Sequence, residues 1–351
     1  MKRFKWLLFA GLTGVIPRLS AQTVEATWTT EWQYDFRRQV NWVNLLRLDA
    51  AAEPWRGGSF ELATLHIAHT GSHIVPDLQG FSNVEAENCA AALAKLGYRH
   101  QWEGIGLFLG VRNVNEDFFT SPCTSLFTGS SCGIFPTVSA SYPIANYPMS
   151  GLCLHADASF GAWKIVASLY DGVGSSGWNR SDNPFLLDFR HDGLFGMAEV
   201  SRQGERGRYF AGAALHNRFF PVGSDGEQLP SDEALHRVSC AWYFYAEQAL
   251  WRCGAKRIDL MVQYSENTEK RSGCSRYAEI GCTWQNGEKF RTGISAQYAD
   301  FVQGGEWSVE ATARYAPNAL FSLQPSFQFI RNGAGSFAVF SMRICCNFGL
   351  F

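Results

Sequence analysis

The sequence predicts an all-β fold: a transmembrane antiparallel β-barrel of sixteen strands with one long loop folded inward. The 351 residues are 46% hydrophobic, 15% aromatic and only 18% charged, and 34 of them are glycine. Mean hydropathy is nevertheless only −0.13, and no apolar run approaches the roughly 20 residues that a transmembrane helix requires. From about residue 237 onward, apolar and polar residues alternate in segments of roughly ten, which is the pattern of membrane strands.

The first 21 residues have the layout of a secretory signal peptide, and the barrel is expected to comprise residues 22–351. Lys2, Arg3 and Lys5 precede a short, mostly apolar stretch, and Ala21 stands directly before the expected cleavage site. The stretch is too short to span a bilayer stably; a buried N-terminal helix is the alternative. Cleavage would remove four basic and no acidic residues, so the formal net charge would change from −2 to −6. A mildly acidic exported chain is a poor candidate for nucleic-acid binding.

The apolar side chains of the late segments share one face, and the charged side chains share the other. In one segment Ile258, Leu260 and Val262 alternate with Arg257 and Asp259. The apolar faces of these segments carry no charge, as expected of a membrane barrel, because a Lys or Arg facing lipid at the bilayer midplane costs about 2–4 kcal/mol. A soluble β-sandwich would also alternate, but with its apolar face inward, shorter strands and no need for aromatic residues near the segment ends.

Sixteen segments have the strand pattern, and their number is even, as bacterial single-chain barrels require. Short and long connections alternate, which predicts short periplasmic turns, long outer loops and both termini in the periplasm. Pro325 lies inside one segment and cannot donate a ladder hydrogen bond, so we expect a bulge or local break there. The long links are 70–91, 114–150, 171–192 and 220–236. The predicted strands are 26–36, 42–52, 59–69, 92–102, 104–113, 151–160, 162–170, 193–203, 207–219, 237–250, 256–265, 275–285, 289–300, 306–315, 320–330 and 337–350.

The longest link, residues 114–150, is the main candidate for a functional element. Surface loops are ordinarily polar and flexible, whereas this one contains several aromatic residues and prolines. Cys123 and Cys132 lie within it and could close a stiffening disulfide in an oxidising compartment. A sixteen-strand barrel leaves an aqueous lumen, so we predict that this loop folds inward and narrows the channel. Decoration of the outer surface is the alternative.

Several short motifs follow one another along most of the mature chain. They are Gly110–Asn113, Glu116–Phe118, Leu126–Phe127, Phe135–Pro136, Tyr147–Pro148, Ser168–Gly172 and Ala246–Arg252. Their order resembles that of the carbohydrate-selective porin family of the OprB type. The resemblance implies an outer-membrane porin for passive diffusion of sugars, lined by Arg, acidic and aromatic side chains. The ten cysteines depart from the family pattern, and so does Phe351, which falls on the polar parity.

A sugar presents hydroxyl groups and an apolar ring face, so its channel needs charged or amide groups and aromatic rings on the wall. Binding must be strong enough to admit the solute and weak enough to release it. Asn113, Asn115 and Glu116, at the loop base, are expected to come nearest the narrowest point. Each inward charge could instead belong to a salt-bridge lattice in the wall, and the mixed signs argue against strong selectivity for anions or cations. The other inward candidates are Arg47, Asp49, Arg99, Arg112, Lys164, Glu247, Arg257, Asp259, Arg291, Glu310, Arg314 and Arg343.

Two other classes of function stay open: an outer-membrane barrel enzyme, and a non-conducting anchor or receptor barrel. An enzyme would place His beside Ser or Asp, but the chain has no Gly-x-Ser-x-Gly or Walker motif. It has no Cys-x-x-Cys pair, and His66 and His69 lie on opposite faces of a strand, so neither a cofactor nor a metal is expected. An anchor would want a plug or a separate domain, for which the residues before 26 leave no room. The expected partners are sugars as permeating solutes and the lipids of the bacterial outer membrane, with a homotrimer as a possible assembly.

Overall fold

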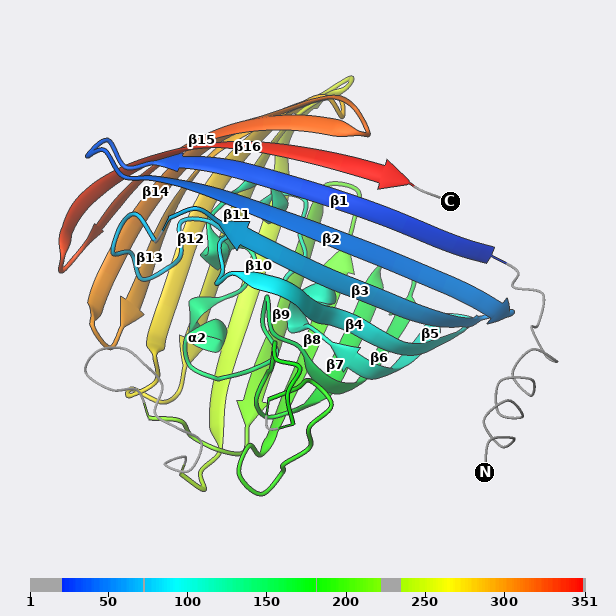
Figure 1. The fold of residues 1–351 in the computed structure, drawn as a ribbon. Helices are drawn as coiled ribbons and strands as arrows, with labels where there is room; N and C mark the ends of the chain where they lie inside the picture. The colour runs from blue at the N-terminus through cyan, green and yellow to red at the C-terminus, as the bar shows by residue number, and fades with distance from the viewer. Residues whose placement is uncertain (1–20, 72, 181, 222–234, 350–351) are drawn as a thin grey trace, which may run out of the picture.

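In the computed structural model, sixteen antiparallel strands close into a barrel, in which strands consecutive in the chain are neighbours and β1 pairs with β16 (Figure 1). The structure describes residues 21–71, 73–180, 182–221 and 235–349. The predicted signal peptide, apart from Ala21, and Phe351 lie outside the described residues. The strands are β1 Ala21–Tyr34, β2 Val40–Trp55, β3 Gly58–His69, β4 Cys89–Trp102, β5 Ile105–Arg112, β6 Gly151–Phe160, β7 Trp163–Asp171, β8 Leu194–Gln203, β9 Gly207–His216, β10 Ser239–Cys253, β11 Lys256–Asn267, β12 Cys274–Asn286, β13 Phe290–Phe301, β14 Gly304–Asn318, β15 Phe321–Asn332 and β16 Gly335–Gly349.

The predicted fold class is confirmed, and each of the sixteen predicted segments coincides with one strand. The ends differ by a few residues: β1 begins at Ala21 rather than at residue 26, and β9 ends at His216 rather than at residue 219. β1 extends further because its ladder with β2 continues to the pair Ala21–Glu53, beyond the clearest alternation. Among the described residues, no helix combines the length and the apolar character needed to cross a membrane.

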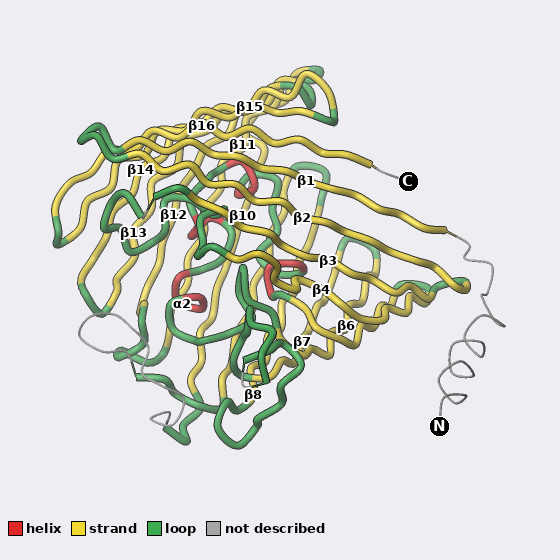
Figure 2. Tube along the Cα trace, in the orientation of Figure 1, coloured by secondary structure: helices red, strands yellow, loops and turns green. Residues whose placement is uncertain are grey.

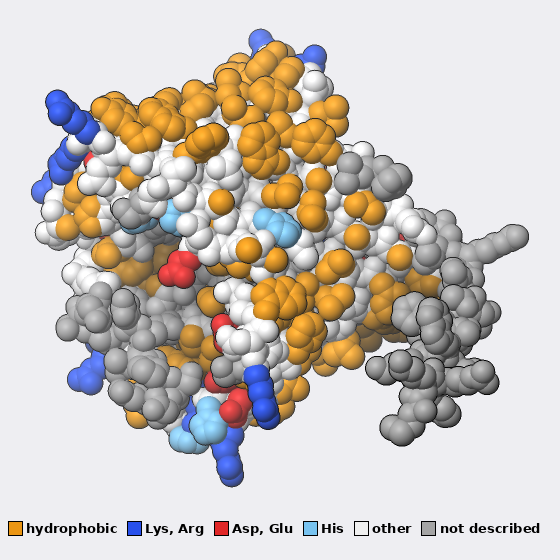
Figure 3. All heavy atoms as spheres, viewed as in Figure 1, with side chains coloured by type: hydrophobic (Ala, Val, Ile, Leu, Met, Phe, Trp, Pro, Cys, Tyr) orange, Lys and Arg blue, Asp and Glu red, His pale blue; other side chains and the backbone are white. Residues whose placement is uncertain are grey.

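The two faces of the wall are inverted relative to those of a soluble protein. Large apolar side chains such as Leu154, Ile280 and Ile294 are exposed on the outside. In β13, Ser295 and Gln297 lie on the face opposite to Ile294 and are buried inside. Figure 3 shows the apolar side chains gathered over the outer surface of the strands, with Lys and Arg mainly at the rims. Acyl chains solvate such an outer face without requiring hydrogen bonds, so apolar exposure there costs little.

The connections differ in length at the two ends of the barrel. The end that carries both chain termini has short turns, for which Gly161 and Gly254 supply the left-handed φ angles of +59° and +57°. The long connections, 70–88, 113–150, 172–193 and 217–238, lie at the opposite end. These bounds agree with the predicted links to within a few residues, although most of the last link lies outside the described residues.

The predicted interruption at Pro325 lies on one side of β15 only. The ladder with β14 passes from Thr312–Ser326 to Tyr315–Leu323 and skips the pair at Pro325. On the other side, Pro325 pairs with Met342 in an unbroken ladder with β16. Thr312 Oγ1 donates to the Pro325 carbonyl at 3.0 Å, so a side chain supplies one of the hydrogen bonds at the interruption.

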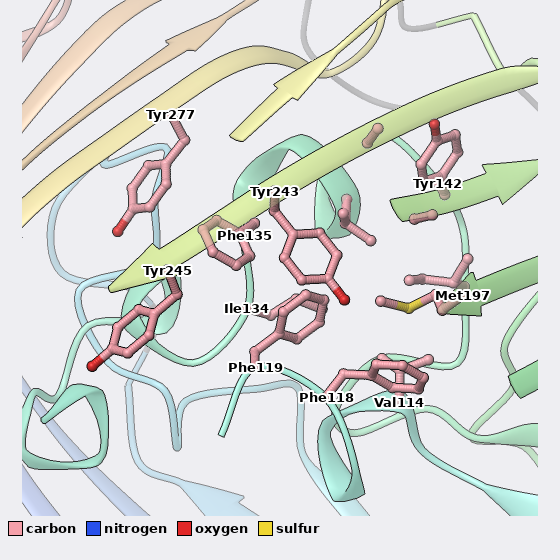
Figure 4. Packing of buried hydrophobic residues seen from close by; sticks show 14 of the residues in the cluster. Val114, Phe118, Phe119, Ile134, Phe135, Tyr142, Met197, Tyr243, Tyr245 and Tyr277 are labelled. Atoms are coloured by element: carbon pink, nitrogen blue, oxygen red, sulfur yellow. The ribbon is translucent and has the colours of Figure 1, made fainter. Parts of the chain in front are cut away.

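The connection 113–150, called here the inward loop, packs inside the barrel, as predicted (Figure 2). It contains three single 3-10 turns and the short helix α2, Pro136–Ser139. Phe119 and Phe135 of the loop pack against Tyr243 of β10, with ring centroids 4.9 Å and 5.0 Å apart (Figure 4). Aromatic pairs at these separations stabilise the contact beyond the area they bury. The aromatic residues of the loop therefore hold it against the inner wall.

Candidate permeation site

Buried carboxylates of the wall fasten the inward loop by accepting hydrogen bonds from its backbone. Glu310 of β14 is fully buried and accepts from the backbone N–H groups of Thr128, at 2.8 Å, and Gly129, at 3.1 Å. It also accepts from the Thr128 hydroxyl at 2.9 Å and the Ser326 hydroxyl at 2.9 Å. Charge-assisted hydrogen bonds of this kind are about twice as strong as neutral ones. Glu310 thus binds the loop rather than facing the open lumen.

Glu247, predicted as a residue of the solute pathway, has a similar position on β10. It is 2% exposed and accepts from the Ser121 hydroxyl at 2.7 Å and from the Cys123 backbone N–H at 3.3 Å. Arg257 lies 3.2 Å from Glu247 and also donates to Asp259. The structure therefore brings the inward candidates Glu247, Arg257 and Asp259 together as a hydrogen-bonded group behind the loop.

The predicted disulfide between Cys123 and Cys132 is wrong, because both residues are free thiols. Cys123 Sγ lies 3.4 Å from the Thr283 hydroxyl, whereas Cys132 Sγ donates to Glu279 at 3.3 Å. Burial raises the pKa of both thiols and keeps them protonated. Both cysteines thus contact strand β12, at side chains four residues apart, and no covalent bond links them.

A second loop, residues 73–88, also folds inward, and the sequence reasoning missed it. Glu306 of β14 accepts from the backbone N–H groups of Leu78, at 2.8 Å, and Gln79, at 2.9 Å. Ile74, Val75 and Phe81 of this loop form a buried apolar cluster with Ile330 and Val339 of the wall. The sequence could have indicated this inward loop by the presence of three large apolar residues in a connection that was expected to lie on the surface. The second inward loop contacts the first, since the Ser130 N–H donates to Gly80 O at 2.8 Å.

His73 bridges two carboxylates within the second inward loop. Its Nδ1 lies 3.0 Å from Glu85 Oε1, and its Nε2 is hydrogen-bonded to Asp77. Burial disfavours the charged ring, but the hydrogen bonds and charges of the two carboxylates outweigh it and raise the pKa of His73 to about 10. The raised pKa means that the bridge contributes its full stability below the ordinary value of 6.5 and loses it as the pH rises through about 10.

We therefore expect the open-channel current noise to rise as the pH increases through about 10, because the second inward loop loosens. The His73→Gln variant is expected to be noisy at neutral pH and to lack this transition. Planar-bilayer recordings between about pH 6.5 and 11 measure both. His191→Gln, at an exposed histidine of another loop, serves as the control. The same pH curve in His73→Gln and the wild-type protein would show that His73 does not hold the loop.

A network of paired charges covers the inner face of β2 to β6, and we call it the charged wall. Arg47 lies 2.7 Å from Asp49 and 2.6 Å from Glu116 of the inward loop. The other pairs of Arg and Lys are Lys95–Glu61 at 3.3 Å, Lys95–Glu116 at 3.5 Å, Arg99–Asp157 at 2.5 Å, Arg112–Asp117 at 2.5 Å and Arg112–Glu61 at 3.9 Å. The wall thus unites the predicted residues Arg47, Asp49, Arg99, Arg112 and Glu116, and it adds four that the prediction missed. The missed residues are Glu61, Lys95, Asp117 and Asp157.

The loop base carries the other predicted residues. Asn113 is buried, where its side-chain oxygen caps the Asn115 N–H at 2.8 Å and its amide donates to Met149 O at 2.7 Å. Asn115 Oδ1 accepts from the Tyr147 N–H at 3.1 Å. Asn113 therefore joins the two ends of the loop, and Asn115 lies beside the cavity described next.

A cavity of about 590 Å³ lies between the two inward loops and the wall. We call it the loop cavity. Its lining is mixed: Asn115, Glu85 and Thr124 are polar, and Phe118 and Tyr147 are aromatic. The rest of the lining is Asn83, Phe119, Thr120, Ser121, Pro122, Ser125, Ser130, Gly133, Ile134, Asn146 and Arg208. Its volume falls within the roughly 300–1,000 Å³ typical of small-molecule sites.

Two further predicted residues, Arg291 and Arg314, are ladder partners on β13 and β14. Arg291 donates to the Pro122 carbonyl of the inward loop. The guanidinium group of Arg314 has no hydrogen bond or ion pair with any described residue. Within the described ranges, no group of His, Cys, Asp and Glu side chains is arranged to hold a metal ion.

The chain matches the family model of the carbohydrate-selective porin, OprB family, over residues 23–348. Among solved structures it is similar to OprB of Pseudomonas putida at high pH, with 13% identity and a TM-score of 0.75, covering 93% of this chain and 94% of that one. It is also similar to an anion-selective porin from Comamonas acidovorans, with 10% identity, a TM-score of 0.60 and coverage of 93% and 99%. The trimer form of Vibrio cholerae OmpT shows 8% identity, a TM-score of 0.59 and coverage of 93% and 99%. These three similarities support the fold. No curated protein sequence matches the chain.

The family model extends from the third residue of β1 to the penultimate residue of β16, and thus over nearly the whole described barrel. The chain belongs to the carbohydrate-selective porin family of the OprB type.

Proposed function

We propose that this porin lets sugars diffuse passively across the outer membrane through the loop cavity. The observation that carries the proposal is the mixed lining of that cavity inside a closed barrel. Membership of a carbohydrate-selective porin family supports the solute class. The proposed function is passive transport without catalysis, which the porin family supports.

The chemistry of the lining suits a sugar. Asn115, Glu85 and Thr124 offer hydrogen-bond groups for the hydroxyls, and the half-buried ring of Tyr147 offers apolar surface for a pyranose face. These groups are few and separated, so binding stays weak enough for release, which conduction requires.

The paired charges beside the cavity are proposed to set its shape and polarity. Arg47, Asp49, Arg99, Arg112 and Glu116 hold the loop base in place and present a strongly polar surface to a passing solute. Behind the loop, Glu247, Arg257 and Asp259 support its far side.

Two further features belong to the proposal. Residues 1–21 are an export signal that is removed, which delivers the barrel to the outer membrane. The barrels assemble as homotrimers, and the similarity to the trimer form of Vibrio cholerae OmpT supports this assembly.

Liposome swelling tests the function directly. Vesicles that contain the folded protein are expected to swell faster in glucose than in an amino acid of equal hydrodynamic size, and heat-modifiable gel mobility confirms folding. Equal rates at equal solute size would reject sugar selectivity and leave a general porin. Absence of swelling and of any conductance from folded protein would reject the channel and favour an anchor or receptor barrel.

A further inference from the structure

The two sides of the lumen differ in how their cations are paired. In the charged wall, each of Arg47, Lys95, Arg99 and Arg112 lies within 4.0 Å of at least one carboxylate. On the other side, one row of ladder partners crosses four neighbouring strands from β11 to β14. It consists of Arg257, Gln285, Arg291 and Arg314. The row lies near the end of the barrel that carries the short turns.

Most of the cations on this second side have no carboxylate partner. Arg257 is neutralised by Asp259 and Glu247. Arg291 donates only to the Pro122 carbonyl, and Arg208 of β9 donates to the Thr120 hydroxyl at 3.4 Å. Among the described residues, no carboxylate lies within 4 Å of the guanidinium groups of Arg208, Arg291 or Arg314.

The nearby carboxylates are already engaged. Glu247 is the ladder partner of Arg208, but its oxygens accept from Ser121, the Cys123 N–H, Tyr245 and Arg257. Glu199 of β8 is buried and accepts from the Phe119 N–H at 3.4 Å. Hydrogen bonds from neutral donors leave the negative charge of a carboxylate in place, so Glu199 contributes at most −1. Glu247 and Asp259 share the single cation Arg257 and together with it carry a net −1. Arg208, Arg291 and Arg314 carry +3, so positive charge is in excess here.

The excess positive charge of these arginines raises the free energy of the folded barrel unless an anion binds to them. Like charges directly opposite each other on neighbouring strands are destabilising, and Arg291 and Arg314 are such a pair. The Nε atoms of Arg208 and Arg291 are buried without a hydrogen-bond partner among the described residues, which adds a desolvation cost. A carboxylate or phosphate oxygen would relieve both costs, and guanidinium groups bind such oxygens well.

Arg208 borders the loop cavity directly, and Arg291 contacts a loop residue that lines it. Arg208 lines the cavity together with Thr120 and Pro122, the loop residues that Arg208 and Arg291 contact. Arg314 extends the same positive surface by one strand. We propose that Arg208, Arg291 and Arg314 form a subsite for the anionic group of an acidic sugar, a carboxylate or a phosphate, at the edge of the loop cavity.

This inference rests on the proposed sugar channel and names a further solute class for it. Block of the potassium chloride current of the full barrel in planar bilayers is measured with glucose, glucuronate, glucose 6-phosphate, acetate and inorganic phosphate. Both acidic sugars are expected to half-block the current at about tenfold lower concentration than glucose does, since one charged hydrogen bond supplies about that factor. A response to only one acidic sugar supports the subsite and identifies its anionic group.

The Arg208→Gln/Arg314→Gln variant removes two cations and keeps Arg291, which supports the loop. Its half-blocking concentrations for the acidic sugars are expected to rise about tenfold, and that for glucose is expected to stay within about twofold. Lys270→Gln/Arg276→Gln removes two cations from the opposite end of the barrel and is expected to change neither. Should the first variant not fold, Arg314→Gln is tested alone, since the Arg314 side chain has no hydrogen bond or ion pair among the described residues that folding would lose. This single substitution is expected to raise the half-blocking concentrations of the acidic sugars about threefold.

Three results would overturn the subsite: equal block by glucuronate, glucose 6-phosphate and glucose; unchanged block in a folded arginine variant; or block by acetate or inorganic phosphate at the concentrations at which the acidic sugars block. In each case a measurable current with glucose block leaves the sugar channel intact. Absence of current from folded wild-type protein would instead reject the channel itself.

Discussion

Replacing Glu310 by alanine is expected to release the inward loop and to raise the single-channel conductance at least about twofold. The fully buried carboxylate satisfies two backbone N–H groups and two hydroxyl groups, at Thr128, Gly129 and Ser326. Each buried donor left without a partner costs about 1–3 kcal/mol. The loop can avoid that cost by leaving the wall and exposing these donors to water. Single-channel recording measures the change, and limited proteolysis reports the loosened loop.

The control variants separate loop release from loss of a charge. Glu310→Gln keeps an acceptor oxygen and is expected to have a smaller effect than Glu310→Ala. Glu266→Ala removes a half-exposed carboxylate that holds no loop and should leave the conductance unchanged. Heat-modifiable gel mobility shows that each barrel is closed. If Glu310→Ala conducts like the wild-type protein and resists protease equally, Glu310 does not fasten the loop.

Replacing Glu116 is expected to abolish most of the discrimination between sugars and other solutes of equal size. Glu116 accepts two hydrogen bonds from Arg47, at 2.6 Å and 3.1 Å, and lies 3.5 Å from Lys95. Its loss removes the contacts of the loop base with Arg47 and Lys95 and leaves Arg112–Asp117 as its remaining ion pair to the charged wall. Lys95 is then left with Glu61 alone. The ratio of swelling rates for glucose and a matched amino acid is expected to fall toward one in Glu116→Ala, while folding is retained.

Acid is expected to reproduce this effect in the wild-type protein. Burial opposes ionisation of Glu116, but the hydrogen bonds and the charges of Arg47, Lys95 and Arg112 outweigh it and lower its pKa below the ordinary 4.5. The ionised carboxylate therefore contributes its stability fully above pH 4.5, and that contribution is lost as the pH falls through the lowered pKa. Swelling ratios should be constant from neutral pH down to about 4.5 and fall only below it.

Glu116→Gln and Glu266→Gln test the assignment. The first cannot ionise, so its swelling ratio is expected to be low at every pH. The second, at a carboxylate outside the charged wall, is expected to follow the wild-type curve. An acid transition that persists in Glu116→Gln would assign the effect to another group and remove Glu116 from the explanation.

Alternation along the chain was sufficient to predict the barrel because the side chains of a strand point alternately to its two faces. The positions of Ile258, Leu260 and Asp259 relative to lipid follow from parity alone, without knowledge of any distant residue. The sixteen strands and the long connections were predicted on this local information. The inward position of residues 113–150 was also predictable, since an aromatic-rich loop gains little in water.

Parity could not decide what an inward charge does. Glu310 and Arg314 occupy the same face of the same strand, yet Glu310 accepts hydrogen bonds from Thr128, 182 residues away, whereas the Arg314 side chain has no hydrogen bond or ion pair among the described residues. Local information also could not show that Cys123 and Cys132 stay unbonded to each other. Their contacts are with wall residues more than a hundred positions away in the sequence. Likewise, the second inward loop depends on Glu306 meeting Leu78, 228 residues away.

The sequence by itself therefore determined the barrel, its lipid and water faces, its family and the inward position of its longest loop. Only the tertiary structure decided which inward carboxylates fasten loops, which pair with arginines, and which arginines are left without a carboxylate. The physical reason is that a polar group inside a barrel is satisfied by whatever backbone or side chain the closed fold brings within about 3 Å of it. For Glu310, Glu247 and Glu306 those partners are backbone N–H groups of loops from distant parts of the chain.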